Sequence, residues 1–356
     1  MKILLTGAAG FVGSHALKYL LTETDAYVVC LVSLEHSGVS ARLRQAMKDY
    51  QGDKGGAQPD LDERVRFIRH DLRSPIDPIT AAQIGDIDVI WNIASESHVD
   101  RSISDPRSFI LNNTELILTM LDYARVAKPK LFLQMSTDEV YGPAPIGHNH
   151  IEWETPLPSN PYSASKQAQE SIAFSYWRTY GVPVVITNTM NIIGEMQDKE
   201  KFAPMVMHKI ATGEPMTIHA SASGEIGSRY YLHAHNLADA WWYLTRSYVG
   251  DRTPTERAWY GDIPVYGDGT DRPAKFHIVG EREVDNLQFA KMISNAMGGD
   301  LNYELVDFHS SRPGHDLRYA LDGTKMEELG WRAPLSLDQS VDKMVAWTLQ
   351  HREWLL

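Results

Sequence analysis

Two pairs of residues near the middle of the chain could carry out chemistry together. Tyr162 and Lys166 are four positions apart in a segment of helical pattern, residues 160–180, so their side chains project from one face of a helix. An ammonium beside a tyrosine lowers the phenol pKa, and a phenolate can take the proton of an alcohol while a hydride leaves the same carbon. Asp138 and Glu139 add two adjacent carboxylic side chains upstream. A redox pair beside an acid and a base predicts a reaction in which oxidation is accompanied by loss of a proton and of water.

The start of the chain predicts where a nicotinamide cofactor binds. Residues 1–5 form an apolar run of buried-strand character, and a helical pattern covers residues 14–22. The turn between them carries the expected cofactor-binding residues Gly7, Gly10, Phe11, Val12 and Gly13. Its glycines would allow a tight turn, close approach of a pyrophosphate and close helix–strand packing, and the helix N-terminus would supply N–H donors. A glycine-rich turn without a ligand is the weaker alternative in this position.

The identity of the cofactor depends on the end of the second expected strand, residues 26–32. An acidic residue here would bind the ribose hydroxyls of NAD, but the chain continues with Ser33 and later has Arg42 and Arg44. The missing acid removes repulsion toward a 2′-phosphate, and Arg42 could pair with such a group. Both arginines could equally lie on a solvated helix face, so NADP stays open as an alternative to NAD.

Composition excludes several classes of protein. The chain has 356 residues, a net charge of −12 and no apolar run of membrane-spanning length, which argues against nucleic-acid and membrane partners. Cys30 is the only cysteine and lies in an apolar segment, so we expect a core residue and a reducing cytoplasm. The N-terminus shows no export signal. An anionic substrate would need a few local cations.

Strand and helix patterns alternate through the first half of the sequence, which predicts an α/β fold with a Rossmann-type doubly wound parallel sheet. Ligands of such sheets bind beyond the carboxyl ends of the strands. Four further residues fall on this edge and are assigned to the cofactor: Asp71, Leu72, Ala94 and Ser97. We therefore expect them to share one cleft with the glycine turn and the acid pair.

The pattern also predicts two structural units. Residues 1–187 form a dinucleotide-binding domain, and residues 229–248 pack back on it. A smaller C-terminal α/β substrate-binding lobe takes residues 188–228 and 249–356. Residues 250–275 are rich in Gly, Pro and Asp and are expected to form a surface loop, although the segment is long enough for a lid or an interface.

Two local predictions concern the acid pair and a histidine-containing loop. Adjacent residues of a strand face opposite sides, so both acids can meet one substrate only if the strand has ended by Ser136 and turned, as we expect. Loop residues His148, His150, Glu152 and Glu154 superficially resemble a metal site. Because nothing in the sequence fixes this loop, we expect solvated side chains and no metal.

These motifs resemble the extended short-chain dehydrogenase/reductase family, and within it the nucleotide-sugar 4,6-dehydratases of the dTDP-glucose 4,6-dehydratase type. The glycine turn and the Tyr162/Lys166 pair mark the superfamily, whereas the acid pair is more specific. Further matching segments are residues 94–103, Asn191, residues 200–204, Arg229, residues 312–320 and residues 329–331. His219 departs from the family, which has an aromatic residue against the nucleotide base, and the 250–275 insertion departs from it too.

The resemblance implies a reaction on a nucleoside-diphosphate hexose. Tyr162 and Lys166 would serve the oxidation at C4, with Thr137 hydrogen-bonded to the reacting hydroxyl. Glu139 would take the C5 proton, and a protonated Asp138 would deliver a proton to the departing 6-hydroxyl before hydride returns to C6. For that role the pKa of Asp138 must be raised, as burial and a neighbouring carboxylate would do.

The resemblance also implies binding residues and an assembly. NAD is the family cofactor, and Asn113 would be the supporting asparagine of the superfamily. The expected substrate-binding residues are Ser97, Asn191, Lys201, Phe202, His219, Arg229, Arg312 and His315. Arginines suit bidentate contact with a diphosphate, whereas Arg318 is expected in a structural ion pair. A homodimer through residues 106–126 and 160–180 is expected.

Three alternatives to this dehydratase remain. An NDP-sugar 4-epimerase or decarboxylase of the same superfamily also oxidises C4 but does not need the acid pair. A dehydratase could instead leave the 5,6-alkene in its product. A non-catalytic nucleotide-binding protein is a different class, and the intact Thr137, Tyr162 and Lys166 argue against it.

Overall fold

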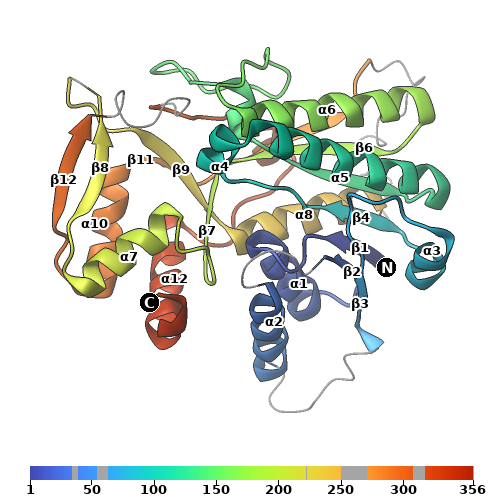
Figure 1. Cartoon of the computed structure of the whole chain (residues 1–356), viewed down its shortest axis with the longest axis horizontal. Coiled ribbons are helices and arrows are strands. Elements are labelled where there is room, and N and C mark those ends of the chain that lie inside the picture. The colour runs from blue at the N-terminus through green and yellow to red at the C-terminus, as the bar shows by residue number, and fades with distance from the viewer. Residues whose placement is uncertain (34–38, 54–62, 222, 250–270, 308–316, 356) are drawn as a thin grey trace.

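A large parallel sheet organises the chain (Figure 1). The computed structural model describes residues 1–33, 39–53, 63–221, 223–249, 271–307 and 317–355. Seven strands run in the order β10-β6-β5-β4-β1-β2-β3, each parallel to its neighbours. They are β1 (Lys2–Thr6), β2 (Tyr27–Val32), β3 (Val65–Arg69), β4 (Val89–Asn92), β5 (Leu131–Thr137), β6 (Val184–Thr189) and β10 (Ala274–Ile278). The strand order reverses between β1 and β4, which confirms the expected Rossmann-type doubly wound sheet.

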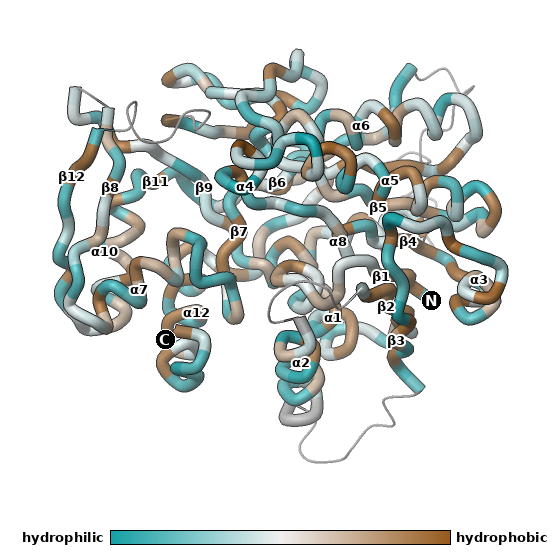
Figure 2. The backbone as a smooth tube through the Cα atoms, in the orientation of Figure 1, coloured by the Kyte–Doolittle hydropathy of each residue, from teal (hydrophilic) through white to brown (hydrophobic). Residues whose placement is uncertain are grey.

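Helices cover both faces of this sheet. One face is covered by α1 (Phe11–Glu23), α2 (Val39–Asp53) and α8 (Ala234–Val249), and the other by α3 (Pro78–Ile84), α5 (Pro106–Ala127) and α6 (Pro161–Tyr180); the short α4 (Val99–Ser104) precedes α5. Successive strand residues face opposite cores, so Ile3 and Leu5 pack with α1 and α8 whereas Leu4 packs with α5 and α6. Because β1, β4 and β5 are covered on both sides, they are largely hydrophobic (Figure 2).

A smaller lobe, at the left of Figure 1, has a core of its own. It contains a sheet of β7 (Asn191–Ile193), β9 (Ser228–His233) and β11 (Glu283–Asp285), and a pair of β8 (Met216–Ala220) and β12 (Tyr303–Asp307). Its helices are α7 (Phe202–Thr212), α10 (Asn286–Met297) and α12 (Leu337–Gln350), followed by a 3₁₀ helix, Arg352–Trp354. The short α11 (Thr324–Glu328) packs instead on the large sheet through Met326. The Tyr231 and Phe289 rings stack at its centre with centroids 3.6 Å apart. Among the described helices, none has the length and apolar character needed to cross a membrane.

The division of the chain differs from the expected one at β10. The sequence places residues 249–356 in the smaller lobe, but β10 pairs with β6 and closes that edge of the large sheet. The pairing satisfies backbone groups of β6 that would otherwise be unpaired. Of residues 229–248, those in α8 pack on the large sheet as expected, where Trp241 and Trp91 meet edge to face at 5.4 Å, but residues 229–233 belong to β9 in the smaller lobe's sheet.

The end of β5 also differs from the expectation. The strand does not end by Ser136 but stays paired with β6 through Thr137. A 3₁₀ helix, Asp138–Tyr141, begins immediately afterwards. Both acids therefore lie on a turn, where the alternation of strand side chains no longer applies.

Candidate active site

A cavity of about 450 Å³ lies at the carboxyl ends of the strands. The residues assigned to the cofactor that line it are Gly7, Gly10, Phe11, Val12, Gly13, Ser33, Arg42, Asp71, Leu72, Ala94, Ser97, Tyr162 and Lys166. Asn113 is fully buried behind this wall, where its Oδ1 accepts the Glu96 backbone N–H and its Nδ2 donates to Ser165 Oγ, both at 2.8 Å. Asn113 therefore joins the cavity wall to α6.

The glycine turn has a shape that only glycine permits. Gly7 has a φ of +72°, and a Cβ on Gly13 would lie 2.0 Å from the Gly7 carbonyl oxygen. Gly10 precedes the first residue of α1 and has no side chain to cap the helix. The free N–H groups of this helix end lie at the cavity wall, so the turn fits the diphosphate of a dinucleotide.

Arg42 lies at the cavity but is held by the smaller lobe. Its Nε donates to the Met196 carbonyl oxygen at 2.9 Å, and its guanidinium lies 5.5 Å from the ring centre of Trp354. Burial lowers its pKa, and the nearby carboxylate of Asp198 opposes this. The arginine is therefore buried at the base of the lobe and is not a solvated helix residue.

Lys166 is fixed deep in the site by α6 and by the end of β5. It is 2% exposed, and its Nζ donates to the Met135 carbonyl oxygen at 2.8 Å and to Gln169 Oε1 at 2.6 Å. Burial lowers the pKa of Lys166 to about 7, although the Glu170 carboxylate opposes this. Gln169 was not foreseen from the sequence, where it is one polar residue among several in a helical segment.

Tyr162 lies beside Thr137 and the two acids. Burial raises the pKa of its phenol, the Glu139 and Asp138 carboxylates raise it further, and the Thr137 hydroxyl acts against this. This is the opposite of the lowered tyrosine pKa expected from Lys166. The physical reason is that Tyr162 is buried beside carboxylates, while the lysine is held by other polar groups and is itself easily deprotonated.

Asp138 has the environment of a proton donor. It is 4% exposed, and its Oδ1 accepts a hydrogen bond from the Thr137 hydroxyl at 2.9 Å. Within the described residues its buried Oδ2 has no hydrogen-bond partner. Burial, together with the neighbouring Glu139 carboxylate, raises the pKa of Asp138 to about 7. The carboxyl group can therefore carry a proton near neutral pH.

Glu139 is half-buried and is tied to the helix that carries Tyr162. Its Oε2 accepts from Asn160 Nδ2 at 3.1 Å, and Asn160 Oδ1 accepts the Ser163 backbone N–H at 2.9 Å as the N-cap of α6. Asn160 therefore fixes the distance between the acid pair and the helix. Sequence reasoning did not single out this residue, although an Asn followed by Pro at a helix start predicts an N-cap.

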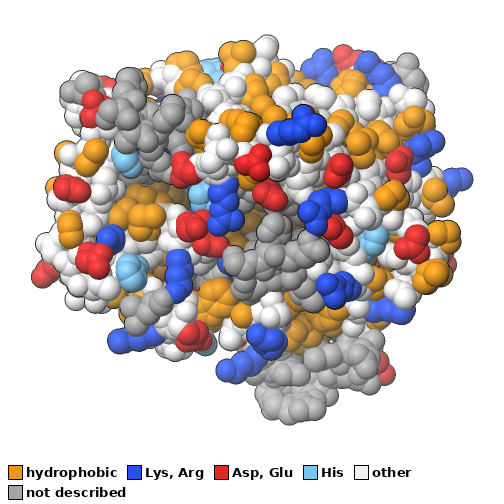
Figure 3. Space-filling view, in the orientation of Figure 1, with side chains coloured by type: hydrophobic (Ala, Val, Ile, Leu, Met, Phe, Trp, Pro, Cys, Tyr) orange, Lys and Arg blue, Asp and Glu red, His pale blue; other side chains and the backbone are white. Residues whose placement is uncertain are grey.

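Two of the expected substrate cations lie near the acids. Lys201 lines the cavity, and burial lowers its pKa while the Glu139 carboxylate opposes this. Arg229 lies 4.5 Å from the ring centre of Tyr319, and its charge lowers the pKa of Asp138. Figure 3 shows basic and acidic side chains interspersed over this face of the molecule, as expected if local cations bind an anionic substrate.

Most of the other expected substrate-binding residues that the structure describes do not line the cavity. Ser97 lines the cavity, whereas Asn191 is exposed on β7, Phe202 stacks on Phe289 at 6.3 Å in the lobe core, and His219 pairs with β12. The latter three are not among the residues lining the cavity. The predictions for Arg312 and His315, and most of the surface loop expected over residues 250–275, fall outside the described residues. The end of that expected loop is wrong, because Ala274 and Lys275 are buried in β10.

A buried ion pair supports the catalytic end of β5 from behind. Lys275 Nζ lies 2.8 Å from Glu170 Oε2, and both side chains are almost fully buried. Glu170 Oε1 accepts from Asn188 Nδ2 at 2.7 Å, and the same amide donates to the Thr137 carbonyl oxygen at 2.8 Å. Through Asn188, the Lys275–Glu170 ion pair is thus connected to the backbone of Thr137, a catalytic candidate. No sequence signal suggested it, because its partners lie far apart in the chain.

Comparison with known proteins identifies the family. The model of the NAD dependent epimerase/dehydratase family matches residues 3–256. The chain belongs to this family. The low-salt glycan biosynthesis protein Agl12 of Haloferax volcanii is 33% identical over 353 residues, covering 98% of this chain and 99% of Agl12. A probable dTDP-glucose 4,6-dehydratase of Sinorhizobium fredii is 31% identical, covering 99% of this chain and 94% of that protein.

Solved structures of this family have the same fold. DesIV of Streptomyces venezuelae, a dTDP-glucose 4,6-dehydratase with NAD bound, matches with a TM-score of 0.79 and 30% identity, covering 99% of this chain and 98% of DesIV. UDP-glucuronic acid 4-epimerase of Bacillus cereus also has a TM-score of 0.79 at 21% identity, with 99% and 100% coverage, so this likeness concerns the fold alone. The family is NAD dependent, and the NADP alternative gains no support from these complexes.

Proposed function

We propose that this protein is an NAD-dependent nucleotide-sugar 4,6-dehydratase. It oxidises C4 of an NDP-hexose transiently, removes water across C5–C6 and ends with a 4-keto-6-deoxy sugar. The observation that carries this proposal is the buried Asp138, whose pKa is raised to about 7, beside Glu139. An epimerase needs no such pair, and the relatives named as dTDP-glucose 4,6-dehydratases support the choice.

The first step requires a base at the 4-hydroxyl. When bound, NAD supplies the acceptor for two electrons from C4 and gives them back at C6. In its phenolate form Tyr162 takes the hydroxyl proton at Oη, and the hydrogen bond from Thr137 favours this form because it lowers the pKa of Tyr162. Protonated Lys166 supplies positive charge on the same helix face, which favours this phenolate, although burial lowers the pKa of the lysine to about 7.

The second step removes water from the ketone. The C4 ketone acidifies C5–H, and Glu139 takes that proton. Asp138 delivers its carboxyl proton to the 6-hydroxyl, which leaves as water while the C5–C6 double bond forms. On hydride return to C6, Glu139 gives its proton back to C5, so the proton that Tyr162 took from the 4-hydroxyl balances the proton lost by Asp138.

The substrate is an NDP-hexose held by local cations, and Lys201 and Arg229 are our candidates for contact with it. We also propose a cytoplasmic homodimer that associates through α5 and α6. In support of this interface, Ile110 and Leu111 on α5 are 37% and 48% exposed. Size-exclusion chromatography with light scattering should give twice the chain mass, and Leu111→Glu should shift it to one chain.

Incubation with a panel of sugar nucleotides tests the activity. The panel contains dTDP-glucose, UDP-glucose, CDP-glucose and GDP-mannose, and the product is followed by mass spectrometry with NAD present. We expect loss of one water from at least one substrate and, in heavy water, uptake of deuterium at C5 but not at C6, because the hydrogen gained at C6 comes from C4. An unchanged mass with every sugar, together with inversion at C4, would instead identify an epimerase.

The Glu139→Gln variant separates the two chemical steps. It should still reduce the cofactor on binding sugar, because Tyr162 and Lys166 are intact, but C5 exchange with solvent should disappear. Full dehydration by this variant would refute the role of Glu139. The comparison with Tyr162→Phe, which should lose cofactor reduction as well, shows that the block falls after oxidation.

A further inference from the structure

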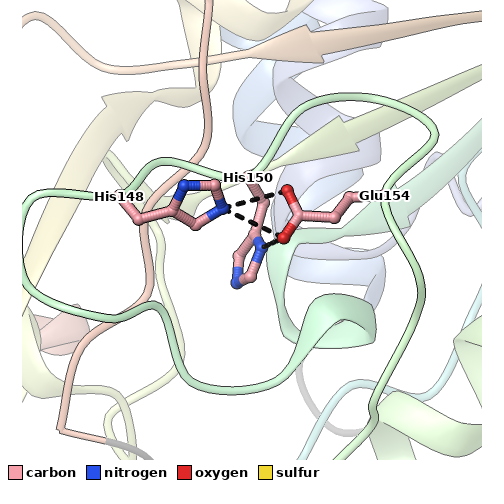
Figure 4. Close-up of side chains that lie close together, drawn as sticks. All are labelled: His148, His150 and Glu154. Carbon is pink, nitrogen blue, oxygen red and sulfur yellow. Dashed lines mark hydrogen bonds and ion pairs between the residues drawn. The ribbon is translucent and has the colours of Figure 1, made fainter.

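Three metal-ligating side chains meet in the segment that follows the acid pair (Figure 4). His148 Nε2 and His150 Nδ1 lie 3.0 Å and 2.9 Å from the same carboxylate oxygen of Glu154. One ligand atom from each residue lies within 4.8 Å of the other two. Within the described residues, this is the one group of three such side chains that meets this geometry. None of the three lines the cavity at the strand ends.

The segment is fixed, contrary to the expectation from the sequence. His150 is 6% exposed. Its backbone N–H donates to the Ala320 carbonyl oxygen at 3.0 Å, and the His150 carbonyl oxygen accepts the Asp322 N–H at 2.9 Å. Its ring stacks on Tyr141 with centroids 5.2 Å apart and an angle of 18°. The middle ligand of the group is therefore held in place from two sides.

Arg318 holds the first ligand. Its Nη1 donates to the carbonyl oxygens of His148 and Pro145 at 2.6 and 2.7 Å, and its Nε lies 2.7 Å from Glu283. This confirms the structural ion pair expected for Arg318. Because Arg318 fixes the loop backbone, only the side chain of His148 needs to adjust for it to bind a metal ion.

We propose that His148 Nε2, His150 Nδ1 and a Glu154 carboxylate oxygen bind a divalent transition-metal ion such as Zn²⁺. Two imidazoles and a carboxylate form a ligand set that zinc uses in proteins. Tetrahedral bonds of about 2.0–2.1 Å place ligand atoms about 3.3 Å apart. The nitrogen–oxygen separations of 3.0 and 2.9 Å are slightly shorter, so only small side-chain movements are needed.

The ligand types determine which metal ions the group selects, and the exposure of its side chains leaves it accessible from solvent. Imidazole nitrogens suit Zn²⁺, Co²⁺ and Ni²⁺, whereas Mg²⁺ prefers oxygen ligands and should not bind. The side chains of His148 and Glu154 are 46% and 31% exposed, which leaves an open path for the ion and room for a water ligand. With a single buried cysteine in the chain, thiolate ligands play no part.

A bound ion would stabilise the backbone beside the acid pair. Tyr141 ends the 3₁₀ helix that Asp138 begins, stacks on His150, and donates its hydroxyl to the Glu152 carbonyl oxygen at 2.7 Å. The ion would join both sides of this loop and so restrict its movement. Its role is structural, and the proposal does not depend on the proposed sugar chemistry.

Isothermal titration of the full-length, EDTA-treated protein with Zn²⁺ tests the site. We expect one ion per chain, a higher thermal midpoint with Zn²⁺ and no effect of Mg²⁺. Glu154→Gln and His148→Gln should each weaken binding by roughly 100-fold or more, since even loss of an outer-shell partner costs up to this much. His148 is exposed, so this variant should fold even where changes at His150 disturb packing.

His208→Gln serves as the matched control, because this histidine lies on α7 and contacts the Leu355 carbonyl oxygen instead. It should bind Zn²⁺ like the unmodified protein. The proposal is overturned if no Zn²⁺ binds, if Mg²⁺ binds equally well, or if His148→Gln and Glu154→Gln retain the affinity. A Co²⁺ complex whose visible spectrum is unchanged by both substitutions would overturn it too.

Discussion

Replacing Asp138 with Asn should change how the stability of the protein depends on pH. Burial and the Glu139 carboxylate raise the pKa of Asp138 from 3.8 to about 7 in the folded protein. The folded state therefore holds a proton that the unfolded chain releases between these two pH values. The stability that Asp138 contributes through this proton is complete below about pH 4 and is lost as the pH rises through about 7. Asn resembles the protonated acid and does not titrate.

The magnitude follows from the same two pKa values. Each pKa unit corresponds to about 1.4 kcal/mol, so a change from 3.8 to about 7 corresponds to at most about 4 kcal/mol. Relative to the unmodified protein, Asp138→Asn should gain up to about this much unfolding free energy between pH 4 and pH 8. Glu139→Gln removes the second cause of the raised pKa and should make the pH dependence of stability smaller.

Urea unfolding at a series of pH values from 4 to 8, monitored by tryptophan fluorescence, measures these differences. The double variant Asp138→Asn/Glu139→Gln completes a thermodynamic cycle and isolates the coupling between the two carboxyl groups. A difference between Asp138→Asn and the unmodified protein that stays constant with pH would refute the raised pKa. It would also remove the main physical argument for Asp138 as the proton donor.

The remaining predictions concern the redox pair, the helix cap and the glycine turn. Tyr162→Phe should lower cofactor reduction by about 10²–10⁴-fold, measured from the absorbance of reduced nicotinamide, and near-normal reduction would exclude Tyr162 as the base. Burial lowers the pKa of Lys166 from 10.5 to about 7. The unmodified protein should therefore gain stability relative to Lys166→Met as the pH rises from about 7 to 10.5. Thermal unfolding at a series of pH values measures this difference, which would stay constant if the lysine were solvated. Asn160→Ser keeps a helix cap but loses the amide that binds Glu139, so turnover should fall while the thermal midpoint changes little. A thermal midpoint that falls in step with turnover would indicate a purely structural role for Asn160. Gly13→Ala should abolish NAD binding or folding, because its Cβ would lie 2.0 Å from a backbone oxygen, and unchanged calorimetric affinity would contradict this.

Local patterns in the sequence predict most of the fold. The alternating strands and helices, the glycine turn and the buried Cys30 depend on residues close together in the chain, so their periodicity and spacing are sufficient. The cavity likewise lies where strand ends of a parallel sheet must meet. The family resemblance then supplied roles for residues that the spacing alone could not assign.

The features that were not predicted depend on contacts between distant segments. β10 pairs with β6 across many intervening residues, and nothing within the β10 sequence identifies that partner. The pKa of Tyr162 is set by burial and by carboxylates that only the folded chain brings near it. The loop around His150 appeared unsupported because its restraints come from residues near the other end of the chain.

The ion pair between Lys275 and Glu170 has a consequence for biosynthesis. The ribosome makes the redox pair and the acid pair long before it reaches Lys275, so a nascent chain at that stage carries the whole reaction machinery without its last sheet partner. Leaving a buried charge uncompensated costs about 3–5 kcal/mol. A truncated protein that ends after the sixth strand would therefore have a buried, unpaired Glu170 and an open, aggregation-prone sheet edge, so stable folding must wait for the C-terminal part of the chain.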